Sequence, residues 1–360
     1  MKKRTVSLML AVFVLLSFTA CKGTEKKSSA SFSSDVASDV IEEPKYVINP
    51  LTGKEDLKKS LKNQKPVAIM INNISTAWGV QSSLSKADVI YETYVEGGIT
   101  RLMAVYKDLK SVGKNYIGSL RSARYSYVDL AAGMNAQFVH AGLDETYCGP
   151  HIEEAGVTTV DLNTTADSGS RKGGNNCAFR WENGLSYEHT LFTKGNDLYS
   201  ELKKLVGLKG YKARNFMNFQ PETETVTPSG GTCKELYVPF VTTDATFKYD
   251  AESGLYKKYR SGEEHKDAAN NKILKFRNVL VLYTSVTTFP DGKHMLESLD
   301  SGDGYYVSNG AYQKIKWSKG APSDPFKFTD KDGNELKANA GKTYVCINSL
   351  SDKSGTKITK

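Results

Sequence analysis

The stretch of sequence that decides the fold covers residues 87–142. It begins ADVIYETYVEGGITRLMAVYKD (87–108) and ends IGSLRSARYSYVDLAAGMNAQFVHAG (117–142). Apolar residues alternate with other residues in the first segment, as in β-strands, and recur at helical spacing in the middle of the second. We therefore expect two strands, a helix, and a short strand that delivers His140 to its end, where α/β proteins tend to place functional groups.

The glycine pair Gly97-Gly98 predicts a tight two-residue turn between the first two strands. In that register Arg101 faces Tyr94 and lies diagonal to both Glu92 and Glu96, on one side of the ribbon. Both sides of the ribbon are largely apolar, so we expect both to be covered and these charges to be withdrawn from water. Removing one partner of a buried ion pair costs about 3 to 5 kcal/mol. Such a pair is more often architecture than chemistry.

Two arginines flank the predicted start of the helix. Ser122 is the expected N-cap residue, with Arg121 and Arg124 on either side of it. Cations are unfavourable near the positive end of a helix dipole, so this pair needs an anion. Either Glu92 or Glu96 supplies it, or a bound carboxylate or phosphate does. The sequence leaves both alternatives open.

The start of the chain is typical of an export signal. Lys2, Lys3 and Arg4 precede the apolar run SLMLAVFVLLSF, and a small residue precedes Cys21. The position of Cys21 resembles the lipobox of bacterial lipoproteins, whose diacylated cysteine becomes the mature N-terminus. An ordinary signal peptide with an incidental cysteine is the alternative. We expect a lipoprotein signal peptide at residues 1–20 and a disordered tether, poor in large apolar groups, at residues 21–45.

The remaining chain predicts an α+β protein in two domains. The apolar run at residues 66–71 indicates a central strand buried on both faces. Residues 211–233 are rich in Asn, Thr, Pro and Gly, as an interdomain connection should be. Strands dominate after it, with a strong hairpin signal at Asn309-Gly310. We expect an N-terminal mixed α/β domain with a central sheet at residues 46–215, then a smaller, mostly antiparallel β domain at residues 216–360.

Composition excludes some classes of function. The net charge of +8 comes mostly from dispersed lysines without interleaved aromatic residues, so we expect no nucleic-acid partner. This balance suits anionic lipid headgroups or wall polymers, although solvated lysines explain it equally well. The sequence has no CxxC, HExxH or Walker motif, and we expect no metal and no cofactor. If Cys21 is acylated, four cysteines remain, and a bridge between Cys148 and Cys177 is the favoured pairing.

Several segments together resemble the YerB-type lipoproteins, a family of exported Gram-positive proteins with two consecutive domains of uncharacterised function. The resemblance rests on NPLTG (49–53), PVAIMINN (66–73), ADVIYETYVEGGITR (87–101), RSAR (121–124), VHAG (139–142), KWSK (316–319) and GKTYV (341–345). It implies the two-domain architecture and a lipid-anchored location on the outer face of the cell membrane, without an established reaction. The chain has Tyr125 where the family commonly has proline, and Glu188-His189-Thr190 where the family has Pro-His-Asn, which weakens a catalytic role for His189.

Two hypotheses for function follow. The first is a binding or assembly module for an anionic envelope ligand, such as a cell-wall fragment, held by an arginine-rich cleft. Its residues are Arg101, Arg121, Ser122, Arg124 and Arg180. The alternative is a cell-envelope hydrolase or transferase with Glu92 or Glu96 and His140 or His189 as acid and base. A scaffold for membrane-protein partners is a third option, and the sequence favours a non-enzyme.

Overall fold

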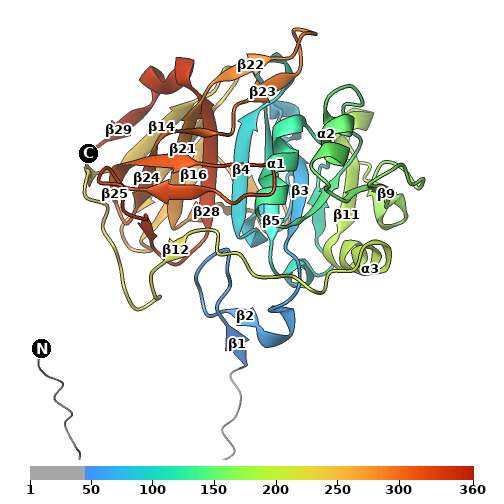
Figure 1. Cartoon of the computed structure of the whole chain (residues 1–360), viewed down its shortest axis with the longest axis horizontal. Coiled ribbons are helices and arrows are strands. Elements are labelled where there is room, and N and C mark those ends of the chain that lie inside the picture. Colours follow the sequence, from blue (N-terminus) through green and yellow to red (C-terminus); the bar gives the residue numbers. More distant parts are fainter. Residues whose placement is uncertain (1–44) are drawn as a thin grey trace, which may run out of the picture. The chain divides into compact units, whose positions relative to one another are not determined.

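A computed structural model describes residues 45–360. Cys21, the expected signal peptide and the expected tether up to residue 44 lie outside the described residues. Within the described part, no helix combines the length and the apolar character needed to cross a membrane. The described chain is one body of many strands and a few short helices (Figure 1).

A twelve-stranded mixed sheet runs through this body. Its order from edge to edge is β13 (Gly231–Thr232), β25 (Ala311–Ser318), β24 (Ser301–Ser308), β21 (Asn278–Thr284), β28 (Thr343–Ser349), β4 (Val89–Tyr94), β5 (Thr100–Tyr106), β3 (Val67–Asn72), β7 (Gln137–His140), β8 (Thr159–Asp161) and β9 (Arg171–Gly173), with β26 (Lys327–Thr329) beside β25. The run at residues 66–71 is therefore a central strand, buried along its length as predicted.

Smaller sheets and helices cover this main sheet. A six-stranded sheet contains β17 (Glu263–Glu264), β16 (Leu255–Arg260), β15 (Asp244–Asp250), β14 (Glu235–Pro239), β29 (Lys357–Thr359) and β20 (Lys275–Phe276). A three-stranded sheet contains β10 (Ala178–Arg180), β11 (Leu191–Lys194) and β6 (Tyr116–Gly118). Two-stranded pairs are β1 (Tyr46–Val47) with β2 (Leu57–Lys58), β12 (Asn218–Phe219) with β27 (Lys337–Ala338), β18 (Lys266–Asp267) with β19 (Lys272–Ile273), and β22 (Val286–Thr288) with β23 (Met295–Glu297). The α-helices are α1 (Tyr125–Gly133), α2 (Cys148–Glu154) and α3 (Gly195–Leu205).

The parallel strands of the main sheet begin along one border of the sheet and end along the opposite border. Strand β4 is parallel to β28 and β28 to β21, while β3, β7, β8 and β9 are parallel in series. Strand β5 is antiparallel to both β4 and β3, so these seven strands all point the same way. We call the edge where they end the carboxyl edge and the edge where they begin the amino edge. The domain boundary at residues 215 and 216 stays a prediction, but the pairing of β4 with β28 carries one sheet across it.

The fold is richer in β-structure than the predicted α+β class. One face of the main sheet is covered by α1 and α2, and α1 lies in front of its central strands in Figure 1. The other face packs against α3 and against the six-stranded sheet, through residues such as Leu236 and Phe247. A second sheet therefore does much of the covering that helices do in α/β proteins. The Asn309-Gly310 hairpin between β24 and β25 is confirmed.

The predicted register of the first hairpin is wrong by one residue. Strands β4 and β5 are joined by a longer turn that contains one 3₁₀ turn, Glu96–Gly98, and the backbone N–H of Val95 donates to the carbonyl of Ile99 at 2.8 Å. Thr93 therefore pairs with Arg101, and Glu92 pairs with Leu102. A slip of one residue moves side chains to the other face, so Arg101 and Glu92 lie on opposite faces of the sheet. Both faces are covered, as predicted.

The predicted disulfide between Cys148 and Cys177 is also wrong. Cys148 is the first residue of α2 and is buried in the core on that face of the main sheet, whereas Cys177 packs against the core on the other face. A disulfide needs Cα atoms within about 7 Å, which two faces of one sheet do not allow. The four cysteines of the described chain are all free thiols.

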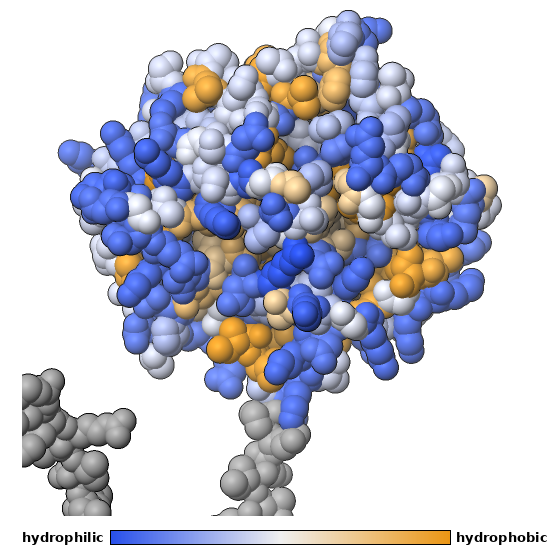
Figure 2. All heavy atoms as spheres, viewed as in Figure 1, coloured by the Kyte–Doolittle hydropathy of each residue, from blue (hydrophilic) through white to orange (hydrophobic). Residues whose placement is uncertain are grey.

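The surface of the described body is mainly hydrophilic. Figure 2 shows polar and charged residues over most of the visible face, with hydrophobic residues in small separate groups. Exposed large apolar side chains are few in the described chain, and scattered residues of this kind are normal on soluble domains. A binding site on this body is therefore expected among its charged pockets rather than at an apolar patch.

Candidate functional site

A loop at residues 119–124 carries Arg121 and Arg124, two of the predicted arginines, across the carboxyl edge. The backbone N–H of Arg121 donates to the carbonyl of Met70 at 3.1 Å, and Ala141 donates to the carbonyl of Arg121 at 3.0 Å. These bonds fix the loop over the ends of β3 and β7. Helix α1 begins after Arg124, which is its N-cap residue and gives no side-chain cap. The prediction that Ser122 caps the helix is therefore wrong.

Glu96 is the anion that two of the arginines need. Its carboxylate pairs with Arg124 through a short contact to Nε and with Arg101 at 3.5 Å. Arg101 is only 4% exposed and also donates to the carbonyl of Ser122 at 2.8 Å. Burial and the nearby charge of Arg124 lower the pKa of Arg101 to about 9, and Glu96 opposes this shift. Burial would raise the pKa of Glu96, but the Arg124 hydrogen bond and both cations lower it below its usual value.

A hairpin from the distant end of the chain closes this cluster. His294, just before β23, lies with its Nε2 at 3.3 Å from the Glu96 carboxylate and its Nδ1 at 2.5 Å from Asp291. Glu297 in β23 is buried and accepts a 3.0 Å hydrogen bond from the hydroxyl of Thr93. Sequence reasoning missed both residues, because nothing local to them indicates a partner some two hundred positions earlier.

Arg121 and Arg180 lie at the same edge but make different contacts. Arg121 donates to the carbonyl of Glu188 at 3.1 Å, and its buried Nε has no hydrogen-bond partner within the described chain. Arg180 donates to the carbonyl of Tyr187 at 2.6 Å, and its guanidinium stacks 3.5 Å above the Tyr187 ring. Of the predicted ligand-binding arginines, these two are the ones without a carboxylate ion pair in the described structure.

The predicted acid and base residues lie in separate hydrogen-bond networks. Glu92 is buried and accepts from Asn73 and Thr100, both at 2.8 Å. His140 is buried between the Gly142 carbonyl at 2.9 Å and the Thr159 hydroxyl at 3.0 Å. His189 is buried with its Nδ1 2.8 Å from the Asn72 amide. Among the described residues, no hydrogen bond joins Glu92 or Glu96 to His140 or His189. The hydrolase or transferase alternative stays a prediction.

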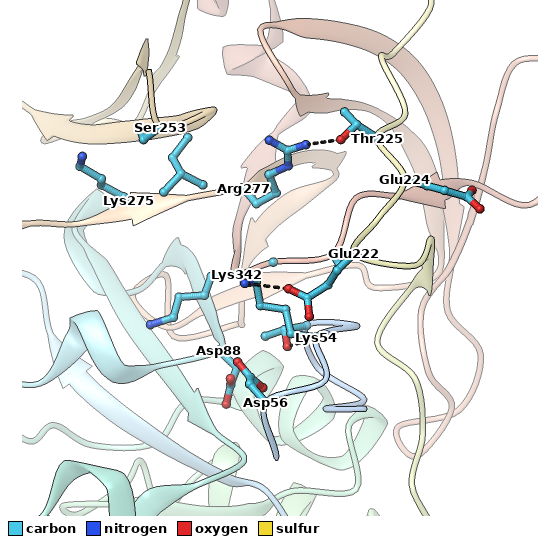
Figure 3. Close-up of a pocket in the computed structure, with 14 residues that line it drawn as sticks. Lys54, Asp56, Asp88, Glu222, Glu224, Thr225, Ser253, Lys275, Arg277 and Lys342 are labelled. Atoms are coloured by element: carbon cyan, nitrogen blue, oxygen red, sulfur yellow. Dashed lines mark hydrogen bonds and ion pairs between the residues drawn. The ribbon is translucent and has the colours of Figure 1, made fainter. Parts of the chain in front are cut away.

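The amino edge carries an open pocket of about 500 Å³ (Figure 3). Lys342 directly precedes β28, Asp88 directly precedes β4 and Arg277 directly precedes β21, so parallel strands bring their first residues together. The Gly341 N–H donates to the Thr52 carbonyl at 2.7 Å. The NPLTG, ADVIYE and GKTYV segments therefore meet at this pocket, although they are far apart in the sequence.

The pocket is lined by charges of both signs. Its basic residues are Lys54, Lys275, Arg277 and Lys342, and its acidic residues are Asp56, Asp88, Glu222 and Glu224. Arg277 uses its guanidinium to hold the Gly254 carbonyl at 2.9 Å and the Thr225 hydroxyl at 3.2 Å, and it has no carboxylate partner in the described chain. Lys54 pairs with Glu222 at 3.0 Å, and both side chains are substantially exposed. The sequence prediction named none of these residues as a site.

Two carboxylates lie together at the base of this pocket. Figure 3 shows the carboxyl groups of Asp56 and Asp88 side by side below Lys54. Burial raises the pKa of Asp88 to about 6, although hydrogen bonds from the Lys107 backbone and the Asn49 side chain and the charge of Lys342 oppose the shift. Burial lowers the pKa of Lys342. Among the described residues, no group of three or more His, Cys, Asp or Glu side chains could hold a metal ion.

Known proteins resemble this chain along most of its length. Residues 51–211 match the N-terminal domain, and residues 236–345 the C-terminal domain, of the family described as "Protein of unknown function (DUF3048)". A relative described as "Putative lipoprotein YerB", from Bacillus subtilis (strain 168), is 27% identical over 315 residues, covering 83% of this chain and 85% of the relative.

A solved structure shows the same fold. The crystal structure of the YerB protein from Bacillus subtilis aligns with a TM-score of 0.71 and 22% sequence identity, covering 87% of this chain and 100% of that one. The two family domains follow each other in the expected order, and the sequence relative spans both. The chain therefore belongs to the YerB-type family of proteins built from the two consecutive DUF3048 domains.

Proposed function

We propose that this protein is a lipid-anchored extracytoplasmic binding module that holds an anionic ligand in the amino-edge pocket. The observation that carries the proposal is the cationic wall of that pocket, where Arg277 and Lys275 stand at an open cavity of about 500 Å³. Cavities of about 300 to 1,000 Å³ are typical of small-molecule sites. A ligand of this size carrying a carboxylate or phosphate, such as a cell-wall fragment, fits this description.

The chemistry of Arg277 suits an anion. Its two described hydrogen bonds go to a carbonyl and a hydroxyl, which leave its charge uncompensated, and the planar guanidinium retains free donors. Guanidinium groups bind carboxylate and phosphate in a bidentate manner. Lys275 is different, because it shares the Asp250 carboxylate at 3.4 Å, so we assign it a secondary role.

The anchor part of the proposal rests on Cys21. Its position after an apolar leader is that of a lipidated cysteine, and the curated relative is described as a lipoprotein. Two or three acyl chains on one residue are enough for stable membrane attachment. Fatty-acid labelling of cells that express the native protein or Cys21→Ser tests this directly, because only the native protein should carry the label. Equal labelling of the variant would remove the anchor from the proposal.

The ligand part is tested by isothermal titration of the purified full-length protein. Inorganic phosphate and soluble cell-wall fragments serve as probes. Replacing both Arg277 and Lys275 by alanine should weaken binding by about tenfold or more, since each such charge-assisted contact contributes on the order of 1.5 to 3 kcal/mol. Thermal unfolding of the same variant checks that the fold is retained.

The matched control replaces two basic residues by alanine at the carboxyl edge. Arg121→Ala combined with Arg180→Ala removes the two arginines there that lack a carboxylate ion pair, and it should leave the affinity unchanged. The reverse result would move the ligand to the arginine cleft predicted from the sequence, at Arg101, Arg121, Ser122, Arg124 and Arg180. Absence of binding by the native protein to either probe would overturn the proposal.

A further inference from the structure

A group of lysines surrounds the place where the described chain begins. We call this surface the lysine face. Its members are Lys45, Lys62, Lys65, Lys110, Lys203, Lys209 and Lys212. All but Lys65 are classed as exposed, and Lys65 is partly exposed. They come from separate segments of the chain, so the sequence alone did not reveal the group.

Backbone contacts hold these segments together. The Lys65 N–H donates to the Leu208 carbonyl at 2.7 Å, and the Tyr211 N–H donates to the Asn63 carbonyl at 3.0 Å. These bonds press residues 208–212 against residues 61–65. A cavity of about 690 Å³ is bordered by Lys110, Lys203 and Lys209 together with both of these segments. In Figure 1, β2 and α3 lie toward the same end of the described body, the lower end of the view.

The positive charge of this face is poorly compensated. Glu201 is largely buried and pairs with Lys204 at 3.7 Å, rather than with a member of the lysine face. The Asp108 carboxylate caps the following turn, where it accepts a 3.2 Å hydrogen bond from the backbone N–H of Ser111. No ion pair is described for the seven lysines in residues 45–360. Lysines gathered on one surface, three of them around one cavity, favour an anionic partner.

Two tyrosines line the same cavity as the lysines. The Lys110 ammonium lies 5.2 Å from the centre of the Tyr199 ring, and Tyr211 lines the same cavity. Lysine stems and tyrosine rings are amphipathic, with an apolar body and a polar tip, which is the character of side chains at membrane interfaces. The chemistry of the face therefore matches a charged lipid surface better than a dry protein interface.

The position of Lys45, close in sequence to the expected anchor at Cys21, favours a membrane as the anionic partner. The Lys59 N–H donates to the Lys45 carbonyl at 3.2 Å, so the first described residue is fixed to the start of the short turn that leads to Lys62. Residues 22–44 connect this point to Cys21 and can span at most about 80 Å in any conformation. If Cys21 carries the lipid, this connection keeps the lysine face near the bilayer and raises its effective concentration there.

We infer that the lysine face docks the folded body against anionic lipid headgroups beside the anchor. Basic residues near an anionic leaflet each add to binding, and the attraction decays within a Debye length of about 8 Å at physiological salt. The docking would fix which side of the body faces the membrane. The inference shares the anchor at Cys21 with the proposed function, but it does not depend on a ligand in the amino-edge pocket.

Vesicle flotation tests the inference with residues 22–360, which carry neither the lipid nor the apolar leader and contain the whole folded body. Vesicles of phosphatidylcholine containing phosphatidylglycerol should bind the protein, and vesicles of phosphatidylcholine alone should not. High salt should release it. Replacing Lys110, Lys203 and Lys209 by glutamate should weaken binding by about tenfold or more.

The control variant makes the same charge change elsewhere. Lys314, Lys316 and Lys337 are exposed on β25 and β27, and replacing them by glutamate should change vesicle binding by less than about twofold. Equal losses in the two variants would show that net charge alone drives binding and would overturn the assignment. Failure of the native surface to bind these vesicles, or binding to purified anionic wall polymer in their place, would also overturn it. Titration with phosphate and wall fragments tests ligand binding at Arg277, whereas vesicle flotation tests membrane docking by the lysine face. Failure of one proposal can therefore be distinguished from failure of the other.

Discussion

The two edges of the main sheet differ in how their charged side chains are paired. At the carboxyl edge, Arg101, Arg124 and His294 converge on the single carboxylate of Glu96. At the amino edge, Arg277 and Lys342 border an open pocket and have no carboxylate ion pair in the described chain. The charges that stand out in the sequence are those that satisfy each other. A dense group of charged residues therefore indicates burial as readily as binding.

The packing above each edge explains the difference. The β22–β23 hairpin brings His294 onto the carboxyl edge, and the stacked rings of Tyr147 and Phe289, 4.1 Å apart, hold the tip of the hairpin there. At the amino edge the strand starts are joined by backbone bonds such as that from the Thr343 N–H to the Asp88 carbonyl at 3.1 Å, and the turn of the β15–β16 hairpin borders the pocket without closing it. One edge is thus closed by a distant part of the chain, while the other keeps a cavity.

The largest expected effect comes from Glu96→Gln. It leaves the buried Arg101 without its carboxylate, and loss of one partner of a buried pair costs about 3 to 5 kcal/mol. Because the Glu96 side chain is 26% exposed, we expect the lower end, about 3 kcal/mol. The free energy of unfolding in urea measures this change.

The matched control at the amino edge is Glu222→Gln, which breaks the exposed pair with Lys54. Exposed pairs contribute about 0 to 1 kcal/mol, so this variant should unfold at nearly the native urea concentration. Equal losses in the two variants would remove the contrast between a closed and an open edge.

The pH dependence of stability should also differ between the edges. The pKa of Asp88 is raised to about 6 from an ordinary 3.8, so the folded protein binds more protons than the unfolded chain between these values. Stability linked to Asp88 is therefore lost as pH rises from about 4 to about 6, by about 1 to 2 kcal/mol after allowance for partial exposure. The pKa of Glu96 is lowered, so its contribution is present above 4.5 and is lost as pH falls below that value.

Urea titrations across the acidic range measure these slopes. Asp88→Asn should remove the loss between pH 4 and 6, while Asp332→Asn, at an exposed turn, should leave it in place. If the Asp88→Asn curve retains the native slope, Asp88 is not the group that titrates there. An anionic ligand in the pocket should also bind more tightly below pH 6, where Asp88 is neutral.

The smallest expected effect is none. Because Cys148 and Cys177 lie on opposite faces of the sheet as free thiols, a reducing agent should not change the midpoint of thermal unfolding. Removal of a native disulfide typically costs 2 to 5 kcal/mol, so the alternative is easily detected. A clear fall in the midpoint under reducing conditions would contradict the described packing.

Local pattern predicted many single elements correctly. The apolar run at 66–71 is a buried strand, and Asn309-Gly310 is a hairpin turn. It was less successful with the overall class, because the six-stranded sheet covers a face where we expected helices. Short strands of this kind have no strong periodicity of their own, and pairing partners are not visible in one sequence.

The candidate site was much less predictable. The sequence predicted that Arg101 lies close to Glu96, and the two residues do form an ion pair, but the register error also assigned Arg101 to the face of Glu92. It gave no sign of the amino-edge pocket, whose residues Thr52, Asp88, Arg277 and Lys342 come from widely separated segments. Spacing along the chain reports only on neighbours within a few residues.

The sequence by itself determined the family, the burial of both faces of the β4–β5 ribbon and the location of the strongest turns. These depend on hydrophobic period and turn chemistry, which are local properties. Only the tertiary structure decided which charges neutralise each other, which edge stays open and which lysines share a surface. Those outcomes depend on the path of the chain between distant residues, because electrostatic partners and cavities form from three-dimensional proximity rather than from sequence order.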